Sequence, residues 1–306
     1  ISAQDLGGAA VHMGRSGVAH LSAADDASAL ELVKQLLGYL PQNNSEDPPP
    51  ITPYDPAERM DAALDCIVPE TESQAYDMRD VLGHVFDRAS VLELQPDYAP
   101  NALVAFARLD GFPVGVVANQ PAHLAGALDI DASDKIARFI RTCDAYNIPL
   151  ATFIDCPGFL PGKDPWYDGM IRHGAKIIYA YGEATVPRIS IVTREAPGGA
   201  YVTMSSKQMR IDLAFAWPTP QIAVMGAEQA PRVGVRHVLL ADVHALGIER
   251  LRDVDPVVDD QADPGGAQQR KQLAAECQHR AGVNVLVAQL NQRGAVLDRG
   301  AYHRFH

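Results

Sequence analysis

Apolar segments of strand length alternate with helical patterns through the middle of the chain, and this alternation constrains the fold most. The apolar segments are residues 103–109, 114–118, 148–154, 189–193, 213–217 and 222–225. One helical pattern is capped by Ser133 and runs to about Ala145, a second covers about Asp168 to Glu183, and a short helix opens at Gly198. Strands that are apolar throughout are buried on both faces. The pattern therefore predicts an α/β fold with helices packed on a buried sheet.

Turn signals divide the rest of the chain. Asp110-Gly111 separates the first two apolar segments and predicts a hairpin. Residues 1–40 read as a Gly-rich loop followed by an amphipathic helix that starts near Asp25. The Pro-rich stretch 41–56 propagates neither helix nor central strand, so it predicts a linker. Beyond about residue 230 the periodicity is lost, apart from a helix expected at 268–280.

Composition excludes several classes of function. The 306 residues are 47% apolar, enough for a sizeable core, and the net charge of −12 argues against binding nucleic acid or anionic membranes. No apolar run approaches the roughly 18 residues of a membrane span, and no signal peptide is evident. The four cysteines lie far apart without a CxxC pair, which predicts reduced thiols in a cytoplasmic protein and no metal site.

Two glycine-containing loops are the best candidates for chemistry. Each follows an apolar strand: residues 156–162, with the sequence CPGFLPG, and residues 196–201, with the sequence APGGAY. Glycine lets a ligand approach main-chain N–H groups, and the N–H groups at a helix start are unpaired and carry positive partial charge. Two such donors aimed at one point would form an oxyanion hole. The alternative is a tight strand-to-helix turn without a chemical role.

Conventional catalytic patterns are weak. There is no GxGxxG sequence, no P-loop and no GxSxG elbow. His173 could act as a general base, but a role on the helix surface or in capping is favoured. Asp129 and Asp131 could be paired carboxylates, yet Asp131, Ser133 and Asp134 stand where a helix N-cap and first turn belong.

An ordered series of segments runs through residues 154–227: IDCPGFLPG at 154–162, IRHGAK at 171–176, EATVP at 183–187, GGAY at 198–201, MSSK at 204–207, FAWPT at 215–219 and IAVMGA at 222–227. Together these segments resemble the C-terminal domain of acyl-CoA carboxylase β subunits of the propionyl-CoA carboxylase type. The resemblance covers about residues 1–230. It implies a ClpP/crotonase-like fold, built from repeated ββα turns with helices packed on the sheets. It also implies three parts: 1–50, the tail of an N-terminal carboxyltransferase domain and the Pro-rich linker; 51–235, the C-terminal carboxyltransferase domain; and 236–306, a divergent tail.

The resemblance implies a carboxyltransferase that moves CO2 from carboxybiotin to the α-carbon of a short-chain acyl-CoA, propionyl- or acetyl-CoA. The backbone N–H groups of Gly199 and Ala200 would form the oxyanion hole. Biotin would be bound by Gly158, Phe159, Gly198, Gly199 and Ala200, and the substrate pocket would include Pro157, Tyr201 and Val202. Biotin itself would then be the base, consistent with the lack of a convincing side-chain base.

The implied partners are a biotin carboxylase and biotin carrier subunit, acyl-CoA, and further copies of the chain in dimers and a hexamer. One departure is Pro197, which stands where an aromatic residue is usual and removes a backbone donor. Two alternatives stay open: a biotin-dependent acyl-CoA decarboxylase subunit, which shares these loops, and a non-catalytic assembly subunit. A plain enoyl-CoA hydratase is disfavoured because its paired Glu residues are not evident.

Overall fold

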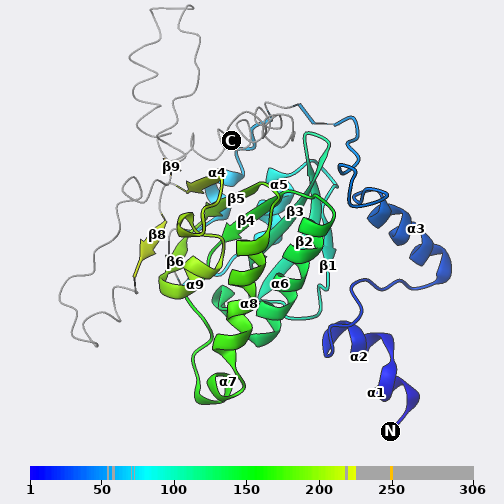
Figure 1. The fold of residues 1–306 in the computed structure, drawn as a ribbon, viewed down its shortest axis with the longest axis horizontal. Helices are drawn as coiled ribbons and strands as arrows, with labels where there is room; N and C mark the ends of the chain where they lie inside the picture. The colour runs from blue at the N-terminus through cyan, green and yellow to red at the C-terminus, as the bar shows by residue number, and fades with distance from the viewer. Residues whose placement is uncertain are drawn as a thin grey trace, which may run out of the picture.

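A mixed sheet of seven strands forms the centre of the molecule (Figure 1). The computed structural model describes residues 1–53, 55–56, 59–69, 71, 73–217 and 220–224, with the backbone of 249–250. The sheet has the order β1-β2-β3-β4-β5-β7-β9. Its strands are β1 (Leu92–Leu94), β2 (Ala102–Leu109), β3 (Phe112–Asn119), β4 (Leu150–Ile154), β5 (Arg188–Val192), β7 (Leu213–Ala216) and β9 (Glu249–Arg250). A second, two-stranded sheet pairs β6 (Glu195–Pro197) with β8 (Gln221–Ala223).

The predicted hairpin is confirmed. Strands β2 and β3 are antiparallel, with Leu109 opposite Phe112. Asp110 and Gly111 both have positive φ, 51° and 79°, as the two-residue turns that match strand twist require. From β3 onward the strands β3, β4, β5 and β7 are parallel, so their carboxyl ends meet at one edge.

One unit repeats along the parallel part of the sheet. A strand of the large sheet leads to a short segment in a second layer, and a helix then returns the chain. Strand β4 leads to Phe159 and then to α8 (Met170–Glu183), while β5 leads to β6 and then to α9 (Gly198–Thr203). In the second layer, Phe159 forms a parallel bridge with Leu128, and β6 pairs in parallel with β8. This is the ββα repeat expected from the sequence.

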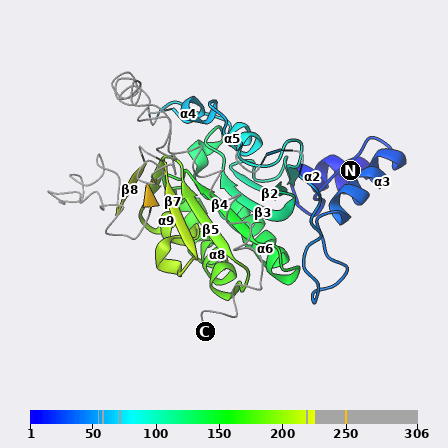
Figure 2. The same cartoon turned by 90° about the horizontal axis from the view of Figure 1, so that it is seen from above.

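Helices cover both faces of the large sheet. One core joins the face with Val104 and Phe106 to α6 (Ile130–Ala145) and α8. The other core joins the face with Leu103 and Ala105 to α4 (Leu64–Ile67) and α5 (Met78–Val85). Figures 1 and 2 show α6 and α8 on one side of the sheet and α4 and α5 on the other. Strand β2 is buried along its whole length, as expected for a strand enclosed between two helical layers.

The N-terminal part differs from expectation at two points. Two short helices, α1 (Ala3–Gly7) and α2 (Ala9–Gly14), stand where the Gly-rich loop was expected. The predicted amphipathic helix is present as α3 (Asp26–Leu37), with Asp25 as its N-cap. Helix α6 begins three residues before the predicted cap: Asp129, not Ser133, accepts the capping bond, from the N–H of Ala132 at 2.8 Å. The helix expected at 268–280 lies outside the described residues.

Arg108 fixes the Pro-rich linker, whose described residues form neither helix nor strand. The Arg108 guanidinium donates to the carbonyls of Gly38 (2.6 Å), Pro49 (3.0 Å) and Gly111 (2.7 Å). It also lies 4.8 Å from the centre of the Tyr39 ring. The linker is therefore bound to the turn of the β2–β3 hairpin, because one buried cation satisfies carbonyls from both.

Candidate functional site

The two predicted loops lie side by side at the carboxyl ends of β4 and β5. The N–H of Cys156 donates to the carbonyl of Glu195 at 2.8 Å, which joins the first loop to β6. On its other side, the first loop is held by two hydrogen bonds with Leu128. The N–H of Leu128 donates to the carbonyl of Gly158 at 3.0 Å, and the N–H of Leu160 donates to the carbonyl of Leu128 at 2.7 Å. The loops therefore occupy fixed positions in the second layer.

Helix α9 presents its first turn at this edge. Gly198 has φ 62°, and a Cβ there would also lie 3.0 Å from the carbonyl oxygen of Val224, so glycine suits this position. Gly199 is exposed, with no atom within 4 Å of where its Cβ would stand. First-turn N–H groups have no acceptor within their own helix and lie at the positive end of its dipole. The start of α9 can therefore offer backbone donors to an anionic or carbonyl oxygen.

An apolar pocket of about 410 Å³ lies between α8 and α9. It is lined by Phe159, Trp166, Met170, Ile171, Gly174, Ala175, Ile178, Gly199, Val202 and Thr203. Trp166 belongs to α7 (Lys163–Tyr167), a short helix that the sequence did not predict. Three of the predicted site residues, Phe159, Gly199 and Val202, thus share one pocket.

The other predicted residues lie around this pocket but do not line it. Tyr201 is only 4% exposed and packs in the core, where burial raises the pKa of its phenol to about 12. The Ala200 side chain is buried as well, so this residue can offer only its backbone. Pro157 is exposed and Gly158 half-buried in the neighbouring loop. Tyr201 is therefore a support of the pocket wall and not part of its surface.

Phe159 depends on a glycine of α8. A Cβ on Gly174 would come within 2.7 Å of the Phe159 ring, so no larger residue fits beneath the ring as it lies. The absence of a side chain at position 174 allows the ring to lie directly on the helix. The sequence shows this glycine within a helical pattern but gives no sign of what packs on it.

A buried ion pair behind the two loops was missed by sequence reasoning. Asp155, at the end of β4, is fully buried, and its Oδ2 lies 3.1 Å from Nε of Arg194, just after β5. The N–H is not aligned for a hydrogen bond, so the attraction is ionic. Burial raises the pKa of Asp155, and the Arg194 guanidinium opposes that shift. Asp155 Oδ1 also accepts from the N–H of Glu195 at 3.1 Å, so the pair connects the loop after β4 to β6.

The Asp155–Arg194 pair extends to the far side of the sheet. Arg194 donates to the carbonyls of Thr71 (3.1 Å) and Gln74 (2.7 Å), and it lies over the ring of Tyr76. A charged residue after each of two neighbouring apolar strands is the signal that could have suggested this pair.

His173 joins two helices and does not line the pocket. Its Nδ1 lies 2.9 Å from Oδ1 of Asp134 on α6, and Lys176 contacts the same carboxylate at 2.6 Å. The prediction of a non-catalytic helix role agrees with this geometry. Asp129 is the cap of α6, so the paired-carboxylate interpretation has no support.

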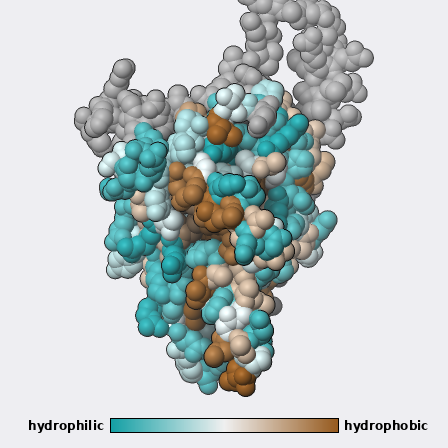
Figure 3. Space-filling view, turned by 90° about the vertical axis from the view of Figure 1, so that its right-hand side faces the viewer, coloured by the Kyte–Doolittle hydropathy of each residue, from teal (hydrophilic) through white to brown (hydrophobic). Residues whose placement is uncertain are grey.

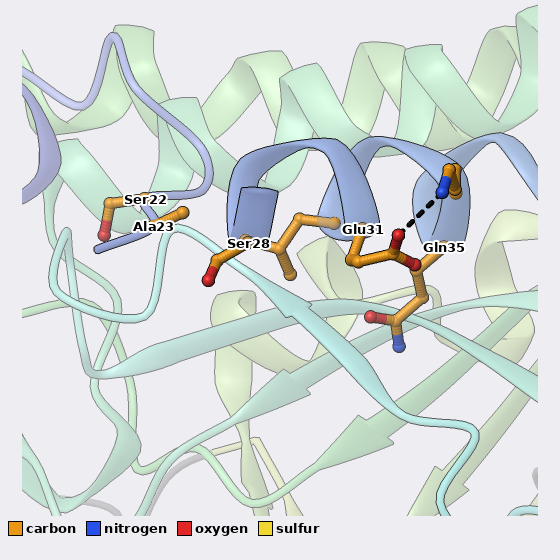
Figure 4. Close-up of a pocket in the computed structure, with 7 residues that line it drawn as sticks. Ser22, Ala23, Ser28, Glu31 and Gln35 are labelled. Carbon is orange, nitrogen blue, oxygen red and sulfur yellow. Dashed lines mark hydrogen bonds and ion pairs between the residues drawn. The ribbon is translucent and has the colours of Figure 1, made fainter. Parts of the chain in front are cut away.

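Other kinds of site find no support in the described part of the chain. No cluster of three metal-ligating side chains occurs among the described residues. None of the described helices is long and apolar enough to cross a membrane. A further hollow, open to solvent, lies along α3, where Ser28, Glu31 and Gln35 project on the same side (Figure 4). None of the predicted site residues borders it.

Comparison with known proteins gives consistent results. The model of the carboxyl transferase domain matches residues 1–283. The biotin-dependent acetyl-/propionyl-coenzyme A carboxylase beta5 subunit of Mycobacterium tuberculosis is 51% identical over 262 residues, covering 82% of this chain and 47% of that protein. The methylmalonyl-CoA decarboxylase subunit alpha of Veillonella parvula is 48% identical over 233 residues, covering 76% of this chain and 46% of that protein. The chain thus spans about half the length of the curated relatives it matches.

A solved structure has the same fold. The transcarboxylase 12S structure, described as a hexamer assembly with methylmalonyl-coenzyme A bound, is 38% identical with a TM-score of 0.78 and covers 97% of this chain and 56% of that one. The crotonase-like fold expected from the sequence is therefore confirmed. The domain match and these identities show that the chain belongs to the carboxyl transferase domain family.

Proposed function

We propose that this chain provides the biotin-binding half of a carboxyltransferase site, which moves a carboxyl group between biotin and a short-chain acyl-CoA. The observation that carries the proposal is the composition of the α8–α9 pocket: none of its ten lining residues is titratable. The Thr203 hydroxyl already donates to the carbonyl of Gly199 at 2.8 Å, and the Trp166 side chain has only an indole N–H donor. The pocket can therefore bind and orient a group, but it contributes no side-chain acid or base.

Biotin fits this pocket chemically. Its fused rings are apolar over most of their surface and carry one ureido oxygen. A pocket of about 410 Å³ walled by Phe159 and Val202 lies within the usual size range for small-molecule sites. The backbone N–H groups of Gly199 and Ala200 would donate to the ureido oxygen, with Gly158 and Gly198 forming the neighbouring backbone. When bound, carboxybiotin supplies the carboxyl group.

The residues of this chain would then do two things. Phe159, Ile178 and Val202 exclude water from the group that they surround. The start of α9 stabilises negative charge on an oxygen that accepts from the Gly199 N–H, because preorganised donors need no reorganisation as charge develops. An oxyanion-hole donor of this kind contributes about 3–4 kcal/mol in other enzymes.

The remaining components are inferred from the family. Propionyl- or acetyl-CoA is the proposed acyl substrate, because the Mycobacterium tuberculosis relative is an acetyl-/propionyl-coenzyme A carboxylase subunit. A biotin carrier and biotin carboxylase subunit are the proposed partners. We also propose self-association, up to a hexamer, because transcarboxylase 12S forms a hexamer assembly.

A decarboxylase is the second candidate, favoured by one relative. The Veillonella parvula relative is a methylmalonyl-CoA decarboxylase subunit, nearly as similar to this chain as the carboxylase subunits are. Both activities use the same transfer in opposite directions, so the pocket itself does not distinguish them. The third candidate is an assembly subunit that binds no biotin.

The first test is the binding of biotin methyl ester to the chain, measured by saturation-transfer NMR. Val202→Trp fills the pocket and should abolish the signal. The matched control is Tyr179→Trp on α8, because Tyr179 is exposed and does not line the pocket. Absence of binding, or equal loss in both variants, would refute the biotin site and favour the assembly subunit.

The second test is single-turnover carboxyl transfer from a labelled carboxylated carrier to propionyl-CoA. It compares the chain alone with a chimaera that adds the remaining half of the Mycobacterium tuberculosis relative. Transfer by the chimaera alone is the expected result, because the chain is proposed to hold half of the site. Transfer that runs measurably only from methylmalonyl-CoA to biotin would favour the decarboxylase.

A further inference from the structure

A second cavity, of about 360 Å³, lies between α3, α6 and the strands β1 and β2. Its lining residues are His20, Leu21, Val33, Leu36, Leu40, Leu94, Gln95, Val104, Phe106, Lys135, Arg138, Phe139 and Thr142. None of them lines the α8–α9 pocket, so the two sites are separate.

The walls of this cavity are apolar. Leu36 and Leu40 enclose it from the α3 side, and Val104, Phe106 and Phe139 form its base. Figure 3 views the molecule from the side on which α3 lies and shows apolar side chains gathered in the middle of this face. The volume lies within the range of small-molecule sites, and walls of this kind favour an alkyl chain.

Most polar groups of the cavity are already occupied. The Lys135 ammonium donates to the carbonyls of Gln95 (2.9 Å), Tyr98 (2.8 Å) and Ala102 (2.8 Å), which uses its three protons. The Gln95 side chain donates to Gly17 O, and the Thr142 hydroxyl donates to Arg138 O. These bonds hold the structure together and occupy the Lys135 ammonium and the Thr142 hydroxyl proton.

Arg138 differs from them. It lines the cavity, its side chain is exposed, and it forms no ion pair with an acidic side chain among the described residues. His20 lines the same cavity, and its pKa is lowered by burial and by the charge of Arg138. The ring N–H of His20 also bonds the backbone of Val18, so the donors for an anion at the mouth of the cavity come from Arg138.

We propose that this cavity binds an amphiphile with an unbranched alkyl tail and an anionic head, with a medium-chain carboxylate as the simplest example. The tail would lie among Leu36, Leu40 and Phe106, and the head would meet Arg138. The chain as a whole is strongly acidic, so the attraction must come from local positive charge, which Arg138 presents at the mouth of the cavity. The proposal stands independently of the biotin site.

Three probes of equal tail length test the charge preference: decanoate, decanol and decyltrimethylammonium, titrated into the full chain by calorimetry. We expect decanoate to bind most tightly and the cation most weakly. Octanoate should bind roughly ten-fold more weakly than decanoate, because each buried methylene contributes about 0.8 kcal/mol. No binding of decanoate, or equal binding of the cation, would overturn the proposal.

Matched variants locate the site. Val33→Trp fills the cavity mouth and should weaken decanoate binding about ten-fold, the effect of losing roughly two buried methylenes. Leu30→Trp is its control, because Leu30 lies on the same helix, is similarly exposed (61% against 50%) and does not line the cavity. Equal effects of the two would place the ligand on the outer surface of α3 and refute the cavity.

The cation is tested in the same way. Arg138→Gln should weaken decanoate about two- to five-fold, as expected for an exposed ion pair, and should leave decanol unchanged. Arg141→Gln, three residues further along α6 and outside the lining, should change neither. A loss of decanol binding with Arg138→Gln would show that the residue supports the fold rather than the charged head, and would refute its assigned role.

Discussion

Gly174 on α8 gives a sharp test of how the pocket is built. Replacing it with alanine adds a methyl group that would lie 2.7 Å from Cε1 and 2.8 Å from Cζ of Phe159. Carbon atoms in contact prefer about 3.5–4.0 Å, so the ring must move outward by a large fraction of an ångström or more. Because Phe159 lines the pocket, we expect Gly174→Ala to weaken biotin binding without removing any ligand contact of its own.

The size of the stability change follows from two opposing effects. Alanine in a helix interior is favoured over glycine by about 0.5–1 kcal/mol. Overpacking against an already packed ring costs about 1–3 kcal/mol. Gly182, on the same helix, provides the control, because its added methyl group would meet only Met209 Cε, at 4.0 Å. We therefore expect Gly182→Ala to stabilise the protein. The free energy of unfolding of the Gly174→Ala variant should be lower than that of the Gly182→Ala variant by about 1–3 kcal/mol.

Urea unfolding of both variants, with biotin methyl ester titrated into each, measures the two effects together. The expected result is a lower midpoint and weaker binding for Gly174→Ala, against a raised midpoint and unchanged binding for Gly182→Ala. Equal midpoints and equal affinities would refute the reasoning, because they would mean that Phe159 does not depend on the space above Gly174.

Two further predictions concern charge. Arg194→Met should destabilise the fold by about 3–5 kcal/mol in urea unfolding, because it leaves the buried Asp155 carboxylate without its cation. The double variant with Asp155→Leu should recover most of that loss. Equal losses in the single and double variants would contradict this account. Burial opposes ionisation of Asp134, but Lys176 and His173 outweigh it and lower its pKa, so the contribution of Asp134 to stability is present above about pH 4 and lost below it. Asp134→Asn should accordingly flatten the fall in the urea midpoint between about pH 5 and pH 3, and an unchanged fall would exclude this carboxylate as its source.

Local signals in the sequence predicted most of the α/β core. The Asp110-Gly111 turn and the apolar segments specify strands directly, because each depends only on its own residues. The start of α6 was misplaced because Asp129, Asp131 and Ser133 can all cap a helix. In the structure Asp129 accepts from Ala132, and the Ser133 hydroxyl donates back to the Asp129 carbonyl at 2.7 Å.

The pocket could be predicted only in part. Its loops carry recognisable residues, but the wall from α7 and α8 depends on how distant helices pack. Tyr201 and Val202 illustrate the limit: neighbouring helical residues point about 100° apart, so only one of the two can face the pocket. Asp155 and Arg194 each follow an apolar strand, but they are far apart in the chain and nothing local pairs one with the other. Such pairs become apparent only when the strands are aligned in the sheet.

The hydrogen bonds from Arg108 to the linker also help to keep α3 in place. A segment tethered by a free linker samples a large volume, and ordering it costs entropy each time it docks. Here the carbonyls of Gly38 and Pro49 are held by one side chain of the hairpin, so the chain leaving α3 is anchored almost as soon as the helix ends. The helix is then presented to the sheet at a high effective concentration, and weak contacts of its own are enough to keep it in place. Residues inserted between 40 and 48 would loop outward without releasing α3, whereas loss of the Arg108 guanidinium would turn the same linker into a loose tether.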